Sequence, residues 1–200
     1  MGSYGSPFIL LLGMMRTMTP RPIYQAKFVA PVGVLGICCE ADALTRIEFL
    51  APGIVPQVPD SALARSVCEQ LAAYFADPDF CFNLPFMLGG TAHQNTVWRA
   101  MCAIPRGQTR QYGELAKQFG SSPRAVGQAC GNNPLPIVIP CHRVVSKAGM
   151  GGFNHHNGGY ALDVKRWLLA HEAVTKTQSV IPARAGIRPN KALDSGVIPE

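Results

Sequence analysis

Glycine and proline interrupt this chain so often that any helix or strand in it has to be short. The 200 residues include 20 Gly and 17 Pro, and both residue types turn the chain or end regular structure. They show no three-residue period, which excludes a collagen-like triple helix. No stretch approaches the roughly 18 uninterrupted apolar residues of a membrane-spanning helix. With 48% hydrophobic and 15% charged residues, the chain is neither disordered nor a coiled coil, which predicts a soluble globular protein rich in turns.

The charge is distributed unevenly along the chain. Residues 1–90 carry a net charge of −2, residues 91–173 of +6 and residues 174–200 of +2. A basic half beside a slightly acidic half suggests that residues 91–173 bind a polyanion such as nucleic acid. A solvated basic face would give the same count, so charge alone leaves both interpretations open.

The seven cysteines indicate a reducing compartment. Their number is odd and no C-x-x-C pair occurs, so a disulfide scaffold or a zinc ribbon is unsupported and a cytoplasmic location is expected.

The apolar run at residues 7–13 could be a signal-peptide core, but no Lys or Arg precedes it and no clear cleavage site follows. We therefore expect residues 1–22 to be a disordered extension. Residues 174–200 lack periodicity and are expected to be a disordered tail.

Residues 23–90 have the pattern of a small α/β domain. Short turns separate three strand-like segments, which predicts an antiparallel meander over residues 23–30, 34–40 and 44–50. Asp60 or Ser61 is expected to cap a helix whose apolar face carries Leu63, Val67, Leu71 and Tyr74. An extended linker then ends at Gly90, and because the charge changes sign there we place a domain boundary at that point.

Residues 91–173 are predicted to form a mostly helical domain. Apolar residues recur at helical spacing over residues 93–104, 109–119, 123–131 and 160–173. Thr109 is the expected cap of the second helix, and Ser122-Pro123 is a typical helix start. The second and third helices are short and joined by a tight Gly-containing turn, which is typical of a helix-turn-helix. The apolar run at residues 137–139 is too short for a helix and predicts a buried strand.

Cys141 is the strongest candidate for a reactive residue. It follows the predicted buried strand and Pro140, and His142 comes directly after it. A cysteine reacts as the thiolate, and a nearby imidazole lowers the pKa of the thiol. Because neighbouring residues on a strand point to opposite faces, His142 needs a bridging water or a turn to act on the thiol.

The residues around Cys141 resemble the active-site signature of the O6-alkylguanine-DNA alkyltransferases, also called methylated-DNA–protein-cysteine methyltransferases. The signature here reads Ile137-Val138-Ile139-Pro140-Cys141-His142-Arg143-Val144-Val145. Further family segments follow in order, at residues 97–100, 104–107, 112–116, 124–127, 133–134 and 165–172. The similarity covers residues 91–173 closely and residues 23–90 only in architecture.

The resemblance implies a two-domain α/β protein. Residues 23–90 would form a ribonuclease-H-like three-stranded antiparallel sheet with a helix, and residues 91–173 a mostly helical catalytic domain with a helix-turn-helix.

The resemblance also implies a suicide reaction. An alkylated guanine would be flipped out of the duplex, and Cys141 would take the alkyl group from O6. O4-alkylthymine would react in the same way. No cofactor and no metal are expected. The expected partner is double-stranded DNA containing O6-alkylguanine, bound by a monomer without a membrane.

The resemblance assigns four catalytic residues. Cys141 would be the nucleophile and alkyl acceptor, and His142 would deprotonate it through water. Glu172 would orient His142, as the third member of a triad does. Asn133 would order the active-site turn.

The resemblance also assigns residues that contact DNA. Tyr112 would displace the 3′ phosphate of the target nucleotide, and Arg124 would fill the vacated stack and pair with the orphan cytosine. Three small residues would allow close approach to the minor groove, namely Ala125, Ala129 and Gly131. Taken singly, Tyr112 would be a core aromatic and Arg124 a surface charge; only their order around Cys141 favours a functional interpretation.

The loop at residues 149–159 departs from the family pattern. Many members have a shorter Tyr-Ser-Gly-Gly stretch, whereas here Phe153 takes the aromatic position, and Phe153 and Asn154 are the expected substrate-loop residues. His155 and His156 are adjacent and lack a partner four residues away, which is a weak pattern for a metal site.

Two other functions fit parts of the sequence. A non-catalytic alkyl-lesion-binding protein would share the architecture, but such proteins have Trp in place of the nucleophile, and Cys141 argues against this alternative. A cysteine hydrolase would need an oxyanion hole and an acyl pocket, neither of which the sequence reveals.

Overall fold

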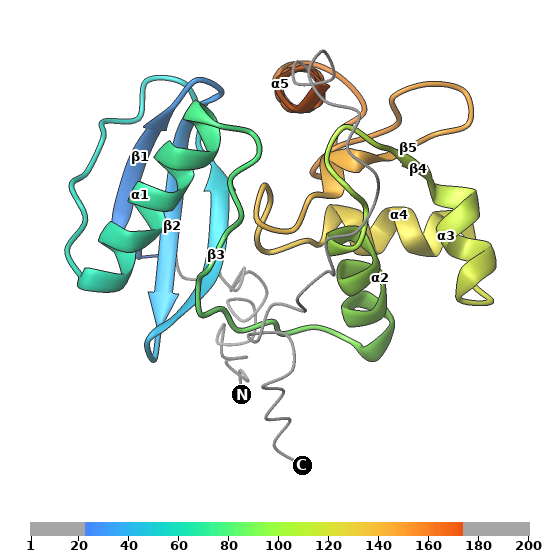
Figure 1. Cartoon of the computed structure of the whole chain (residues 1–200), viewed down its shortest axis with the longest axis horizontal. Coiled ribbons are helices and arrows are strands. Elements are labelled where there is room, and N and C mark those ends of the chain that lie inside the picture. The colour runs from blue at the N-terminus through green and yellow to red at the C-terminus, as the bar shows by residue number, and fades with distance from the viewer. Residues whose placement is uncertain (1–22, 174–200) are drawn as a thin grey trace, which may run out of the picture.

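The computed structural model describes residues 23–173 of the chain. The extension predicted at residues 1–22 and the tail predicted at residues 174–200 lie outside the described residues. The described part is a mixed α/β structure with a three-stranded sheet, a pair of two-residue strands and five α-helices. Figure 1 shows the sheet and helix α1 on the left, and helices α2, α3 and α4 on the right. No α-helix between residues 23 and 173 combines the length and the apolar character needed to span a bilayer.

The first half of the described chain forms the predicted antiparallel meander. Its sheet has the order β1-β2-β3, with strands β1 (Ala26–Ala30), β2 (Gly33–Glu40) and β3 (Ala43–Phe49). The turn between β2 and β3 is built on Ala41 and Asp42, both with positive φ (46° and 61°), the conformation that matches the twist of a two-residue hairpin.

Helix α1 (Ala62–Ala76) covers one face of this sheet. Ser61, and not Asp60, is its cap, because the Ser61 hydroxyl accepts a hydrogen bond from the Ala64 amide at 3.1 Å. The buried face consists of Ala64, Val67, Leu71 and Tyr74, at the helical spacing expected from the sequence, although Leu63 is only half-buried.

The second half contains four helices, α2 (Ala92–Cys102), α3 (Tyr112–Gln118), α4 (Pro123–Gly131) and α5 (Tyr160–Ala173). Ser122 caps α4 and Pro123 takes its first position, as predicted. Helix α4 packs against both α2 and α3. The Trp98 indole of α2 donates a hydrogen bond to the Ala129 carbonyl at 2.8 Å, which fixes α4 against α2.

The predicted cap at Thr109 is wrong. Residues Arg110–Gln111 form a short strand, β4, which pairs in parallel with β5 (Val144–Val145). Helix α3 therefore begins at Tyr112, and the Glu114 carboxylate accepts a hydrogen bond from the Gln111 amide at 2.7 Å. The pairing joins segments more than 30 positions apart, so helical periodicity alone could not reveal it.

The predicted buried strand at residues 137–139 is also wrong. These residues form a tight turn in which the Ile139 amide donates to the Leu135 carbonyl at 2.8 Å, and Ile137 has a positive φ of 77°. Ile137 and Ile139 are buried as expected. The flanking prolines at positions 134, 136 and 140 have no amide donors with which a strand ladder could extend beyond the run, which disfavours a strand.

The linker after α1 joins the two halves. It runs along the outer edge of β3, where the Leu44 amide donates to the Pro85 carbonyl at 2.9 Å and the Met87 amide donates to the Leu44 carbonyl at 3.1 Å. Further along the same strand, the Ile47 amide donates to the Pro134 carbonyl at 2.9 Å. Buried apolar side chains of both halves form one continuous core. The turn that precedes Cys141 is thereby held against the sheet.

Candidate active site

Cys141 lies at the start of a 3₁₀ turn, η1 (Cys141–Arg143), that follows directly on the tight turn at residues 135–139. Asn133 spans that tight turn: its side-chain amide donates to the Ile139 carbonyl at 2.8 Å, and its side-chain oxygen accepts from the Leu135 amide at 3.0 Å. Asn133 is itself buried. Asn133 thus fixes the turn that leads into Cys141, and the Cys141 amide itself donates to the Ile139 carbonyl at 2.8 Å.

His142 and Glu172 form a buried pair behind the thiol. The His142 Nε2 atom lies 2.8 Å from Glu172 Oε1, and both side chains are almost fully buried. An ionised carboxylate only accepts hydrogen bonds, so Nε2 carries the proton and Nδ1 presents a lone pair. Nδ1 is buried and has no hydrogen-bond partner among the residues described. His142 is thus set up to accept a proton at Nδ1.

Two further residues hold the Glu172 carboxylate, and sequence reasoning assigned no role to either. Arg143 donates from Nε to Oε2 and from Nη2 to Oε1, both at 2.8 Å. The Tyr74 hydroxyl donates to Oε1 at 3.0 Å. Burial alone would raise the pKa of Glu172, but hydrogen bonds from His142 and Arg143 hold it well below its usual range. Glu172 is therefore ionised at neutral pH.

Lys165 is a third residue that sequence reasoning missed. It is fully buried, and its ammonium group donates to the Val144 carbonyl at 2.7 Å and to the Gly152 carbonyl at 3.0 Å. Burial lowers the pKa of Lys165 to about 8. Its place in α5 carries no local signal, because its burial depends on the loop that covers it.

The buried thiol and imidazole are both shifted toward their neutral forms. Burial raises the pKa of Cys141, while the Asn133 side chain and the positive charge of Lys165 oppose the rise. Burial likewise lowers the pKa of His142, and Glu172 opposes that change. A neutral imidazole next to a thiol is an available base, and a proton that moves from sulfur to Nδ1 leaves a thiolate and an imidazolium that Glu172 stabilises.

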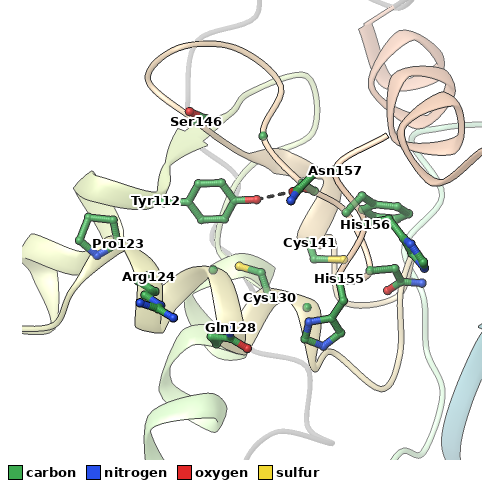
Figure 2. Close-up of a pocket in the computed structure, with 16 residues that line it drawn as sticks. Tyr112, Pro123, Arg124, Gln128, Cys130, Cys141, Ser146, His155, His156 and Asn157 are labelled. Carbon is green, nitrogen blue, oxygen red and sulfur yellow. Dashed lines mark hydrogen bonds between the residues drawn. The ribbon is translucent and has the colours of Figure 1, made fainter. Parts of the chain in front are cut away.

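Cys141 opens into a cavity of about 410 Å³. Figure 2 shows Pro123 and Arg124 on one side of this pocket and His155 and His156 on the other. Tyr112 lies across the pocket, and its hydroxyl donates to the Gly152 carbonyl at 3.2 Å, drawn as a dashed line in Figure 2. A large, partly polar pocket above a cysteine can admit a planar group of the size of a base.

Helix α4 forms one wall of the pocket and carries the candidate DNA contacts. Arg124 is exposed in its first turn and Ala125 is half-buried. Ala129 is buried against α2, so its side chain faces the core. Gly131 has another role in this structure: a Cβ there would lie 2.6 Å from the His155 ring. Its missing side chain makes room for His155.

The loop at residues 149–159 forms the opposite wall. Phe153 is buried and its ring packs against Phe49 of β3, with centroids 5.7 Å apart. Asn154 and His155 have positive φ values of 49° and 63°, which non-glycine residues adopt mostly in turns that the surroundings enforce. The His155 ring nitrogen Nε2 lies 2.9 Å from Asn132 Oδ1 at the end of α4.

The two adjacent histidines do not assemble a metal site. No group of three or more His, Cys, Asp or Glu side chains between residues 23 and 173 is arranged to hold a metal ion. His155 contacts Asn132, whereas the His156 backbone pairs with Phe153, whose amide donates to the His156 carbonyl at 2.9 Å. Both histidines therefore act as walls of the pocket.

Known proteins are similar to this chain in both sequence and architecture. A family model described as 6-O-methylguanine DNA methyltransferase, DNA binding domain, matches residues 92–174. The methylated-DNA–protein-cysteine methyltransferase of Methanosarcina acetivorans is 38% identical over 159 residues, which cover 75% of this chain and 98% of that protein.

Solved structures agree with this match. The Mycobacterium tuberculosis O6-methylguanine methyltransferase superposes with a TM-score of 0.64 at 34% identity, covering 76% of this chain and 94% of the other. The structure of M. tuberculosis OGT in complex with DNA gives a TM-score of 0.62 at 35% identity, covering 76% of this chain and 92% of the other. The resemblance seen around Cys141 is thus confirmed over most of the chain, which belongs to the methylated-DNA–protein-cysteine methyltransferase family.

Proposed function

We propose that this protein repairs DNA by moving the alkyl group of an O6-alkylated guanine onto its own Cys141, once per molecule. The observation that carries the proposal is the buried Cys141 thiol at a base-sized pocket, backed by the His142–Glu172 pair. O4-alkylthymine presents the same alkyl–oxygen bond and is proposed as a second substrate.

The reaction is a direct displacement. The thiol proton passes, through a bridging water, to Nδ1 of His142, and Glu172 stabilises the imidazolium. The sulfur then forms a bond to the alkyl carbon while the bond between that carbon and O6 breaks. The electron pair stays on the guanine oxygen, and the guanine takes up a proton from water at N1, which balances the proton that the thiol gave up. A thioether has no leaving path under cellular conditions, so Cys141 is consumed.

DNA recognition is proposed to use helices α3 and α4 as a helix-turn-helix. Arg124 is exposed at the start of α4 and borders the pocket, which supports a role in replacing the flipped base. Tyr112 lines the same pocket, which supports a contact to the extruded nucleotide. Ala125 lies on the same helix and is half-buried, and its small side chain permits a close approach to the groove.

The larger organisation is proposed on similar grounds. Residues 23–90 would form a ribonuclease-H-like domain, which the antiparallel sheet β1-β2-β3 covered by α1 supports. Residues 91–173 would form the DNA-binding catalytic domain, which their net charge of +6 supports. A monomer is proposed, because the four proposed catalytic residues form the site without a residue from a second chain. The seven cysteines are free thiols, which supports a reducing compartment such as the cytoplasm.

The proposal predicts a stoichiometric adduct. When the protein is mixed with excess duplex DNA containing O6-methylguanine, intact-mass spectrometry should show one added methyl group per chain. Peptide mapping should place it on Cys141 and not on Cys130, which also borders the pocket but whose thiol donates to the Met101 sulfur at 3.5 Å. A lesion-binding protein would gain no mass and a hydrolase would turn over repeatedly, and either result would overturn the proposal.

DNA binding should depend strongly on salt and weakly on sequence. Residues 91–173 carry a net charge of +6, so binding should release counterions from the phosphates. Neutralising even two phosphates predicts an affinity loss of about tenfold between about 50 and 200 mM salt. Fluorescence anisotropy with undamaged duplexes of different sequence measures this effect. An affinity that does not change with salt would contradict the electrostatic account.

A further inference from the structure

The Glu172 carboxylate receives a hydrogen bond from the other half of the chain. Tyr74 belongs to α1, which packs on the three-stranded sheet, and it precedes Glu172 by 98 positions. Its hydroxyl donates to Oε1 at 3.0 Å. The same oxygen accepts from His142 Nε2 at 2.8 Å. A residue of the sheet-bearing half therefore contacts the atom that holds the imidazole.

The packing around the Tyr74 ring fixes the position of its hydroxyl group. The side chain is buried, and its ring packs against Phe75, Phe82 and His171 at centroid distances of 5.4, 5.5 and 5.3 Å. Its own carbonyl accepts a hydrogen bond from His171 Nε2 at 2.9 Å. Both ends of Tyr74 are thus fastened to α5, the helix that carries Glu172.

We propose that Tyr74 is a positioning residue for alkyl transfer, which orients the Glu172 carboxylate so that His142 keeps Nδ1 free to accept the thiol proton. This inference rests on the proposed function. It gives the sheet-bearing half a part in the chemistry beyond packing, because the hydroxyl completes the set of donors around Glu172.

The groups around the pair determine what loss of the hydroxyl does. Glu172 faces His142 and Arg143 of η1 and Tyr74 of α1, and His142 also feels the positive charges of Arg143 and Lys165. Without the phenol, Oε1 keeps more negative charge for His142 and favours the imidazolium. The pKa of His142 rises, so the free base is populated only at higher pH. The acidic limb of the pH–rate profile therefore moves to higher pH.

The test compares Tyr74→Phe with a matched control, Tyr160→Phe. The Tyr160 hydroxyl donates to the Val32 carbonyl, so it also joins α5 to the sheet, but it does not contact Glu172. Single-turnover rates are measured on duplex O6-methylguanine and on free O6-benzylguanine, across the pH range in which His142 titrates. Thermal unfolding shows that each variant is folded.

We expect Tyr74→Phe to slow transfer about tenfold on both substrates, the size expected for losing one hydrogen bond to a charged group, and to move the acidic limb to higher pH. Tyr160→Phe should keep the wild-type rate and profile. A wild-type rate and pH profile in Tyr74→Phe would overturn the inference. Equal slowing in both variants without a shifted limb would also overturn it, because it would indicate packing alone. Failure of the wild-type protein to transfer would instead overturn the proposed function.

Discussion

Cys141→Ala should abolish alkyl transfer and leave DNA binding unchanged. The displacement requires the Cys141 thiol as its nucleophile, and the alanine side chain has no nucleophilic atom. The side chain is buried below the pocket and away from the exposed start of α4, so the contacts to the DNA backbone should persist. Single-turnover transfer from duplex O6-methylguanine should fall below detection, while anisotropy should give the wild-type dissociation constant.

Cys68→Ala is the matched control for this experiment. Cys68 is a free, half-buried thiol on α1 that does not border the pocket of Cys141. Its replacement should leave the transfer rate unchanged. Transfer by Cys141→Ala near the wild-type rate would show that another residue is the acceptor.

Arg124→Ala should separate base flipping from chemistry. Arg124 is exposed in the first turn of α4, whereas Cys141 and His142 lie on η1 and are buried. Loss of the arginine should therefore disable extrusion and leave the thiol intact. Unstacking costs a few kcal/mol, so the rate on duplex DNA should fall on the order of 100-fold. Free O6-benzylguanine needs no flipping and should react at nearly the wild-type rate.

His142→Ala provides the opposite pattern for comparison. It removes the proton acceptor and should slow the duplex and the free base alike. Rate constants for both variants on both substrates decide between the roles. If Arg124→Ala slowed the free base as much as the duplex, its role would be structural and the assignment to base replacement would be wrong.

Local sequence rules were sufficient for most of the secondary structure. The position of the turn between β2 and β3, a helix cap at Asp60 or Ser61 and the start of α4 at Ser122-Pro123 follow from the chemistry of residues next to one another. The structure then chose Ser61 as the cap. The family signature around Cys141 was also readable, because it is contiguous. Such features need no knowledge of distant parts of the chain.

Only the tertiary structure decided the form of residues 137–139 and the start of α3. The apolar run at 137–139 satisfies burial equally well as a strand or a turn. The turn is fixed by the Asn133 side chain, which bonds the Leu135 amide and the Ile139 carbonyl, and by β3, whose Ile47 amide donates to the Pro134 carbonyl. The pairing of β4 with β5 displaces the helix start from Thr109 to Tyr112. A pairing of this kind depends on which segment lies alongside, which local propensity does not encode.

The surroundings of the catalytic pair were likewise beyond the sequence. Tyr74 is an apolar-face residue of α1, Arg143 a basic residue after His142, and Lys165 a lysine in α5. Nothing in their local patterns distinguishes them from a core aromatic and two surface cations. Folding brings Tyr74 and Arg143 onto Glu172 and buries Lys165 beneath the loop. The sequence alone thus singled out Cys141, His142 and Glu172 as candidate site residues, and the fold places His142 against Glu172 and Cys141 at the pocket. Only the fold revealed the donors that orient the Glu172 carboxylate. The reason is that the burial and the electrostatic surroundings of a side chain depend on all the segments that pack around it.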